Sequence, residues 1–504
     1  MKKTFLKGFI AVLASLFSAF SLPPFNHWYL LVLGLIALSL LLKNKFKYSL
    51  VFLALFFLIY FFISLFFLSY FSWPGFIIVC LFETILFSIL LLGLSILQLI
   101  SSNSFLFALS FASLISLAEF VKDSVPFGGL PLGSMALSLT TSPFKYLATL
   151  GGSTFVIFIM SLVAGLIGQS INLFSKKKFI IPSTLFIVAI LIALTQLPLS
   201  KSANNLKQTG SFSAVLVQGG GQVGLHAVTQ GDPEAVFLRQ VYETEKISPK
   251  KKFNLILWPE DTVALSGPIK HSQKIPIIES LAKFYKSYLL TGVTIPVGQY
   301  YFYNQAIEFS PNGSIVGKYE KIHRVPFGEY IPYRSFFSHF GPTNLVPRDA
   351  IPGQKPGVLL TPFAKLGVMI SFEVFFGNLA RDDVNSGANV LVVPTNTASY
   401  KTSQVPSQEL AADRLRAIET GRTLIQASPV GYSDAISKDG NVIKISPLKK
   451  PYLISVNVDL FEGKTIYDKI GKNFFALCYL LIYMLCICFG FVVKVFQKHR
   501  LNQK

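Results

Sequence analysis

The chain has 504 residues, of which 52% are hydrophobic, and its mean hydropathy is +0.54. A soluble protein of this size has about 45–50% apolar residues even when glycine is counted, so the composition excludes an ordinary soluble protein and indicates a membrane protein. The net charge of +20 would suit a nucleic-acid-binding protein only if the basic residues gathered on one face of a soluble domain.

Eight apolar segments approach the length of about 20 residues that a helix needs to cross a bilayer. We expect them at residues 5–21, 26–42, 48–70, 76–100, 103–121, 146–172, 178–198 and 473–495. The first segment has an alternative interpretation as a cleaved signal peptide, because Lys2 and Lys3 precede it and small residues follow it. The sequence thus predicts a transmembrane domain of about seven helices over 1–198, an outer domain over 199–472, and a last transmembrane helix with its tail over 473–504.

Basic residues between these segments predict the orientation, because Lys and Arg of short loops stay on the cytoplasmic side. Thirteen of the 45 basic residues lie at the two ends of the chain and in two of the loops: Lys2, Lys3, Lys7, Lys43, Lys45, Lys47, Lys176, Lys177, Lys178, Lys494, Lys498, Arg500 and Lys504. With eight spans, all of these positions fall on one side. We therefore expect both termini in the cytoplasm and residues 199–472 in the periplasm of a bacterium, bound to its inner membrane. An exported domain does not meet nucleic acid, so no nucleic-acid partner is expected.

The outer domain has no sequence pattern that is typical of a metal site or a cofactor site. All four cysteines lie in predicted spans: Cys80, Cys478, Cys486 and Cys488. His226 and His323 lack the spacing of metal ligands, and residues 219–221 form a Gly-Gly-Gly turn without the surroundings of a phosphate-binding loop. We expect no disulfide, no metal and no cofactor in the outer domain.

The outer domain alternates short β-branched runs with stretches of helical spacing. We predict strands at 212–217, 254–257, 288–291, 306–309, 368–370, 389–393, 423–427 and 453–458, and helices at 233–245, 277–286 and 407–420. Between residues 303 and 321, two strands flank Pro311, Asn312 and Gly313, which is a typical hairpin turn. This mixture predicts a layered α/β sandwich with a mixed sheet.

Ionisable residues follow three of the apolar runs, where open α/β sheets gather their active sites. Glu260 ends the run at 255–260, Lys321 and Glu329 belong to the segment 319–330, and Ser371 and Glu373 follow the run at 367–370. Each residue alone has an ordinary structural explanation as a helix cap, an edge-strand lysine or the start of a turn.

Taken together and in this order, the segments resemble the nitrilase or carbon–nitrogen hydrolase superfamily. The most specific blocks are residues 258–260, 321–332 and 416–422. The eight-span frame narrows the resemblance to the apolipoprotein N-acyltransferases, and it covers nearly the whole chain. The resemblance implies an αββα sandwich with a Glu–Lys–Cys triad.

The resemblance also implies roles for individual residues. Glu260 matches the general base, and Lys321 matches the lysine that stabilises the oxyanion. Glu329 matches an auxiliary carboxylate and Glu373 the acidic residue two positions after the nucleophile. Ser371 stands where the family has its cysteine. We expect Glu260 and Lys321 to face one another across a concave site near Ser371.

The sequence departs from the family pattern at three places. The first is Ser371, because a hydroxyl depends on its base far more than a thiol does. The second is residues 394–399, where Asn396 and Ala398 fit the family's Ser-Asn-Asp-Ala-Trp but the Asp and Trp positions do not. The third is Phe372, where a tyrosine is common.

The implied activity is an acyl transfer in two steps. A membrane phospholipid would donate an acyl chain to the nucleophile, and the amine of the lipid-modified N-terminal cysteine of a diacylglyceryl apolipoprotein would accept it; the enzyme would act as a monomer. The alternative is a catalytically silent relative that binds lipid or lipoprotein. A transporter is disfavoured because the spans hold few paired charges. Glu83 and Glu119 lie within spans, and Glu119 either packs at the membrane interface or lies near the lipid entry.

Overall fold

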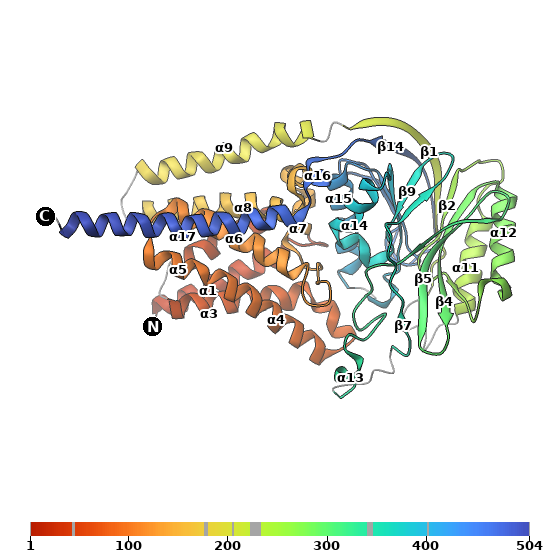
Figure 1. The fold of residues 1–504 in the computed structure, drawn as a ribbon, viewed down its shortest axis with the longest axis horizontal. Coiled ribbons are helices and arrows are strands. Elements are labelled where there is room, and N and C mark those ends of the chain that lie inside the picture. Colours follow the sequence, from red (N-terminus) through yellow and green to blue (C-terminus); the bar gives the residue numbers. More distant parts are fainter. Residues whose placement is uncertain are drawn as a thin grey trace. The chain divides into compact units, whose positions relative to one another are not determined.

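The computed structural model describes residues 2–42, 46–175, 180–203, 206–221, 233–339, 346–400 and 403–502. The chain divides into two compact units (Figure 1). One unit comprises Met1–Ala203 with Ile470–Lys504, and the other comprises Asn204–Lys469. Several residues of the sequence analysis lie outside the described ranges, namely Lys43, Lys45, Lys176, Lys177, Lys178, His226 and Lys504.

The first unit is helical throughout its apolar segments. Its helices are α1 (Lys2–Phe20), α2 (Trp28–Leu41), α3 (Phe46–Ser64), α4 (Trp73–Leu91), α5 (Gly93–Ile100), α6 (Ser104–Lys122), α7 (Met135–Ser138), α8 (Ala148–Phe174), α9 (Ile180–Ala203) and α17 (Lys472–Asn502). Each of the eight predicted segments is therefore largely helical, although α3 ends at Ser64 and a 3₁₀ turn, Phe66–Tyr70, follows it. Gly151 and Gly152 have non-helical backbone angles and kink α8.

Four helical stretches of the described chain are long and apolar enough to cross a membrane: Trp73–Ile100, Ser104–Lys122, Pro143–Phe174 and Lys472–Gln497. The other four apolar helices are shorter, at Thr4–Phe20, Trp28–Leu41, Tyr48–Ser64 and Ile180–Leu194. Large apolar side chains on the outside of α17, such as Leu485 and Phe496, are more than half exposed. A helix face with many exposed apolar side chains is favourable in contact with lipid and unfavourable in contact with water. The helical unit is therefore a membrane domain.

Two carboxylates predicted within spans are enclosed in the membrane domain. Glu83 and Glu119 are almost fully buried. The Glu119 carboxylate accepts a hydrogen bond from the Met135 amide at 3.1 Å and lies 4.0 Å from the Lys122 ammonium. The pairing with Lys122 and the bond to Met135 agree with a packing role for Glu119.

The second unit contains two mixed sheets. The eight-stranded sheet has the order β14-β1-β2-β4-β5-β6, with β3 and β7 attached at its side, and the six-stranded sheet has the order β13-β12-β11-β10-β9-β8. The strands are β1 (Lys207–Gln218), β2 (Leu255–Leu257), β3 (Val263–Ala264), β4 (Tyr288–Val297), β5 (Tyr301–Phe309), β6 (Ile315–Glu320), β7 (Asp349–Ala350), β8 (Val358–Leu360), β9 (Lys365–Val368), β10 (Val390–Pro394), β11 (Leu424–Ala427), β12 (Asp434–Ile436), β13 (Val442–Ile445) and β14 (Tyr452–Glu462).

The two sheets pack face to face, and helices cover their outer faces. One apolar core joins Leu216 and Leu257 of the larger sheet to Val392 and Ile425 of the smaller sheet. A second core joins the other face of the larger sheet to α11 (Pro233–Glu245) and α12 (Lys274–Tyr285). Helices α14 (Gly377–Asn385) and α15 (Val405–Thr420) pack against β9, β11 and β12 (Figure 1). The predicted four-layer αββα sandwich is confirmed.

The predicted β-hairpin is also confirmed. Strands β5 and β6 pair antiparallel, and the Ser310 amide bonds the Ser314 carbonyl across the turn. Gly313 has φ +85°, which glycine adopts without a steric penalty. One predicted strand, 368–370, is displaced: β9 ends at Val368, because Ile370 already belongs to the turn that presents Ser371.

Candidate active site

Glu260 is held by the turn that follows β2. The Trp258 amide donates to the Leu290 carbonyl of β4 at 2.8 Å, and the Gly292 amide of β4 donates to the Pro259 carbonyl at 3.0 Å. A β-carbon on Gly292 would lie 2.5 Å from the Glu260 α-carbon, so only glycine permits this approach. The turn therefore lies directly on β4 and fixes the backbone of Glu260.

Lys321 joins two carboxylates in a buried cluster. Its ammonium lies 2.9 Å from Glu260 Oε1 and 2.9 Å from Glu329 Oε1, and its side chain is 2% exposed. The side-chain amide of Asn304, on β5, donates to the same two oxygens at 2.8 Å each. Two donors and two acceptors thus form a closed square, which we call the acid–lysine cluster: Glu260, Asn304, Lys321 and Glu329.

The two carboxylates of the acid–lysine cluster differ in how many of their oxygens already accept hydrogen bonds. Both oxygens of Glu329 are engaged, since Oε2 accepts the Val325 amide at 2.7 Å. Within the described chain, Glu260 Oε2 accepts no hydrogen bond, and the Glu260 side chain is 5% exposed. Lys321 uses two of its three N–H groups on the carboxylates. Glu260 therefore has an oxygen that can take up a proton, and Lys321 has a donor that can meet an oxyanion.

The charge on Lys321 is secured by its neighbours. Burial by itself would lower the pKa of Lys321, but the Glu260 and Glu329 carboxylates outweigh it and raise that pKa above its usual range. Asp261, directly after Glu260, also has a raised pKa, but for a carboxyl group this favours the uncharged form. Burial, with help from the Glu260 and Glu329 charges, raises the pKa of Asp261 to about 7. The site thus keeps a permanent cation beside a carboxyl group that titrates near neutral pH.

Ser371 stands at the start of a 3₁₀ turn, Ser371–Phe375, that follows β9. Its φ is +52°, in the left-handed region that costs a residue other than glycine on the order of 1 kcal/mol or more. The Ile370 amide donates to Glu373 Oε2 at 2.7 Å, which closes the turn. Ser371 is mostly buried, with 9% of its surface exposed.

Glu373 connects this turn to the acid–lysine cluster. Its Oε1 accepts the amides of Ile322 and His323, the two residues after Lys321, at 2.7 and 2.9 Å. The Tyr319 hydroxyl lies 3.0 Å from both of its oxygens. Burial raises the pKa of Glu373 to about 7, and these donors oppose that rise. One buried carboxyl therefore sets the position of the Ser371 turn relative to the backbone that carries Lys321.

Asn396 contacts the site from the loop after β10. Its side-chain amide lies 3.4 Å from Asp261 Oδ2, and its oxygen accepts the Ala398 amide at 3.1 Å. Of the candidates from the sequence, Glu260, Lys321 and Glu329 are in direct contact, while Glu373 and Asn396 reach the cluster through neighbouring residues. His323 packs its ring on Phe376, with the ring centres 3.7 Å apart.

The comparison with known protein families bears on this arrangement. Residues 193–465 match the family model for carbon–nitrogen hydrolases. The chain belongs to the carbon–nitrogen hydrolase family. Residues 14–166 separately match the model of the apolipoprotein N-acyltransferase N-terminal domain.

Curated relatives resemble this chain in both of its units. The apolipoprotein N-acyltransferase of Pasteurella multocida is 24% identical over 514 residues and covers 96% of each chain. The enzyme of the same name from Shewanella oneidensis is 26% identical over 387 residues, which is 72% of this chain and 70% of that one. Among solved structures, Saccharomyces cerevisiae Nit3, a member of branch 10 of the nitrilase superfamily, aligns with a TM-score of 0.38 and 20% identity, over 50% of this chain and 91% of that one.

Asn304 and Asp261 are site residues that the sequence analysis of this carbon–nitrogen hydrolase did not identify. Asn304 lies in a strand, β5, and the five residues that follow it are buried. A polar residue at a buried position of a strand is the feature that could have indicated Asn304 as a site residue. Asp261 directly follows Glu260, and no pattern in the sequence sets it apart from a solvated charge. Asn304 can be assigned only once β5 and the turn after β2 are brought together.

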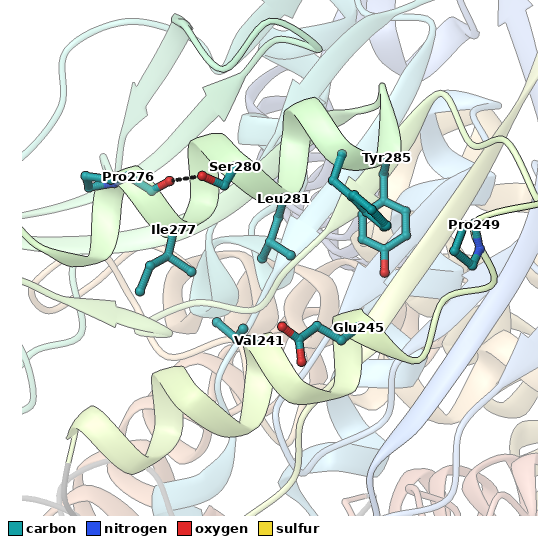
Figure 2. Close-up of a pocket in the computed structure, with 9 residues that line it drawn as sticks. Val241, Glu245, Pro249, Pro276, Ile277, Ser280, Leu281 and Tyr285 are labelled. Carbon is teal, nitrogen blue, oxygen red and sulfur yellow. Dashed lines mark hydrogen bonds between the residues drawn. The ribbon is translucent and has the colours of Figure 1, made fainter.

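The second unit, Asn204–Lys469, which we call the hydrolase unit, has a hollow away from these residues. The hollow measures about 590 Å³ and lies between α11 and α12, where Val241 and Glu245 of one helix face Ile277, Leu281 and Tyr285 of the other (Figure 2). None of its lining residues belongs to the acid–lysine cluster. The chemistry of the site is therefore assigned from the cluster and not from this hollow.

Proposed function

We propose that this protein transfers an acyl chain from a membrane phospholipid to the N-terminal, lipid-modified cysteine of apolipoproteins, with Ser371 as the acyl carrier. The observation that supports it most is that Glu260 Oε2 accepts no hydrogen bond in the described chain and lies beside an ammonium that keeps one unused donor. General-base catalysis and oxyanion stabilisation both need such groups fixed in advance. The curated acyltransferases that match both units favour this activity over a silent binding protein.

In the first step Glu260 takes the proton of the Ser371 hydroxyl, and the oxygen attacks the carbonyl carbon of the phospholipid ester. The third N–H of Lys321 stabilises the negative charge on the carbonyl oxygen. The ester bond to the glycerol then breaks, and protonated Glu260 gives its proton to the departing oxygen. The products are a lysophospholipid and an acyl group on Ser371.

In the second step the neutral α-amine of the acceptor cysteine attacks the acyl group on Ser371. Glu260 takes a proton from the amine, and the Ser371 oxygen leaves and regains that proton. An amide forms, and both residues return to their starting states. The amine arrives as an ammonium ion, so one further proton passes to the solvent.

The serine makes Glu260 more important than it would be beside a cysteine. A thiol with a reference pKa of about 8.5 is partly ionised near neutral pH, whereas a hydroxyl is not. Attack by Ser371 therefore depends on the base at every turnover. The strained backbone of Ser371, with φ +52°, fits a residue that is held for chemistry and not for stability.

The location of the substrates supports the proposed arrangement of the chain. A phospholipid and a diacylglyceryl apolipoprotein are both anchored in a membrane, so a domain at that surface meets them without a search through bulk solvent. We propose that the helical unit spans the bacterial inner membrane, that residues 199–472 lie in the periplasm, and that the protein acts as a monomer. The loop lysines support this orientation.

The test is acyl transfer from a phospholipid with a labelled acyl chain to a synthetic diacylated lipopeptide. Four proteins are compared: the unmodified chain, Ser371→Cys, Ser371→Ala, and Ser371→Cys combined with Glu260→Gln. We expect the unmodified chain to transfer, Ser371→Ala to be inactive, and Ser371→Cys to transfer faster because its thiol ionises more easily. Adding Glu260→Gln should abolish that gain.

Two results would contradict the proposal. Full activity in Ser371→Ala would show that residue 371 is not the acyl carrier. Inactivity of all four proteins, with each of them folded, would favour a protein that binds lipid or lipoprotein without chemistry.

A further inference from the structure

The loop after β10, residues 395–400, is held by two carboxyl groups from different parts of the hydrolase unit. The Thr395 hydroxyl donates a hydrogen bond to Glu409 Oε1 on α15. The neighbouring Asn396 amide reaches Asp261, which directly follows Glu260. The loop therefore connects Glu409 on one side to the turn that carries Glu260 on the other.

Glu409 is enclosed on all sides. Its surface is completely buried, and its Oε2 has no hydrogen-bond partner in the described chain. The titratable groups that interact electrostatically with Glu409 are mostly acidic: Glu260 after β2, Tyr400 at the end of the loop, Asp413 on α15 and Asp434 on β12. Lys321 is the cation that interacts with it. Lys321 is already shared by Glu260 and Glu329, and Arg416 of α15 pairs with Glu419. Among the residues that the structure describes, Glu409 thus has no cation of its own.

We propose that Glu409 is a positioning residue for the active site, and that it acts as an uncharged hydrogen-bond acceptor for Thr395. This inference rests on the proposed acyl transfer. Glu409 does not reach the substrate; it fixes Thr395, and through Asn396 and Asp261 it fixes the turn of Glu260.

The acidic surroundings support the uncharged state. Burial raises the pKa of Glu409 to about 8, with a further rise from the Glu260 charge, while the Thr395 bond and Lys321 oppose it. A neutral carboxyl is what glutamine reproduces closely in shape and as an acceptor.

The backbone of Asp261 explains why this anchoring matters. Its φ is +55°, in the left-handed region that residues other than glycine rarely adopt. The contact from Asn396 is one of the interactions that hold this conformation. If Thr395 loses its acceptor, Asn396 is less firmly placed, and the Glu260 turn loses that support.

The experiment uses the full chain in detergent with phospholipid and compares Glu409→Leu, Glu409→Gln and Thr395→Val. We expect Glu409→Leu and Thr395→Val each to lower the turnover rate by about tenfold with KM nearly unchanged, since a small misplacement of a catalytic group costs rate and not binding. Glu409→Gln should restore most of the rate. The double variant Thr395→Val with Glu409→Leu should be no worse than either single one, because both break the same bond.

A second measurement does not depend on the proposed substrates. In Ser371→Cys, with the four native cysteines replaced by serine, the rate at which iodoacetamide alkylates the thiol introduced at position 371 reports how well Glu260 activates that position. The alkylation rate should fall with Glu409→Leu and recover with Glu409→Gln. If the unmodified chain transfers no acyl group but alkylation still responds to Glu409, the proposed function fails while the positioning role stands.

Matched controls separate positioning from folding. Glu308→Leu removes another buried carboxyl, on β5, that makes no hydrogen bond to this loop in the described chain, and it should leave alkylation unchanged. If Glu409→Leu does not fold, Thr395→Val, which removes only the hydroxyl, decides the question. The proposal is overturned if folded Glu409→Leu or Thr395→Val transfers and alkylates like the parent, or if Glu409→Gln is as impaired as Glu409→Leu.

Discussion

At the scale of single residues, Asn304 decides whether two carboxylates can share one lysine. Its amide donates to Glu260 Oε1 and Glu329 Oε1 at 2.8 Å each. Two negative groups around a single ammonium repel one another, and the second donor offsets part of that repulsion. The charge balance of the acid–lysine cluster therefore depends on a neutral side chain.

Asn304→Asp should be far less active than the parent. The change replaces the donor by a third carboxylate of the same size, so the cluster gains a negative charge and loses two hydrogen bonds. We expect the rate of acyl transfer to fall by about 100-fold, the usual effect of removing a preorganised donor. Asn457→Asp, on an exposed position of β14, is the control and should transfer normally. Equal rates in the two variants would refute this role of Asn304.

Glu308 of β5 predicts a pH dependence of stability that is separate from catalysis. Burial raises the pKa of Glu308 from its ordinary value of 4.5 to about 7, and neither oxygen has a partner in the described chain. Below about pH 4.5 the Glu308 carboxyl is protonated in both the folded and the unfolded chain, so it does not lower the free energy of unfolding. Between these pKa values the unfolded chain ionises first, so stability falls as the pH rises, by on the order of 3 kcal/mol in total.

Glu308→Gln should remove this dependence. We expect a higher melting temperature of the purified chain at about pH 8 and little change at about pH 4.5. Glu320→Gln serves as the control, because its carboxylate is 30% exposed and bonds Lys318. A melting temperature of Glu308→Gln that follows the parent at both pH values would mean that Glu308 is stabilised by another group.

Among the elements, the contact between β4 and the turn after β2 places Glu260, the carboxylate that we propose as the general base. Gly292 permits that contact, because a β-carbon there would meet the Glu260 α-carbon at 2.5 Å and the Pro259 carbonyl oxygen at 2.8 Å. These are backbone atoms, which cannot move aside as a flexible side chain does. The strand and the turn must therefore separate if the glycine is replaced.

Gly292→Ala should impair catalysis more than folding. A shift of the Glu260 turn by a fraction of an ångström disturbs its bonds to Lys321 and Asn304, and we expect a loss of roughly 10- to 100-fold in acyl transfer. Gly267→Ala is the matched control, since no atom lies within 4 Å of its added β-carbon. Comparable activity of the two variants, at comparable melting temperatures, would show that the close approach is not needed.

For the whole molecule, the seven apolar segments that precede the hydrolase unit, together with the loop lysines, predict that this unit lies on the outer side of the membrane. Alkaline phosphatase is active only when exported, so a fusion after Lys250 should be active and a fusion after Lys177 should not. The physical reason is the retention of loop lysines on the cytoplasmic side. An active fusion after Lys177, or an inactive one after Lys250, would exclude the eight-span arrangement.

Most elements and the chemical types of the site residues could be predicted from the amino-acid sequence. The spacing of apolar residues marked α11 at Pro233–Glu245, as observed, and the Asn312–Gly313 turn marked the hairpin of β5 and β6. Both features depend on contacts between residues close in the chain. Short strands such as β12 and β13 were missed, because three or four residues carry too little periodicity to stand out.

Which groups lie together depends on the fold of the whole hydrolase unit. Glu260 and Lys321 are 61 positions apart and Thr395 and Glu409 are 14 apart, and no local pattern encodes their hydrogen bonds. Asn304 became part of the site because β5 carries it to the turn after β2. A residue's type sets what chemistry it can perform, whereas its burial and its neighbours set its charge and its free hydrogen-bonding atoms. Those neighbours come from segments that are distant in the sequence, so the contacts between them form only when the chain folds.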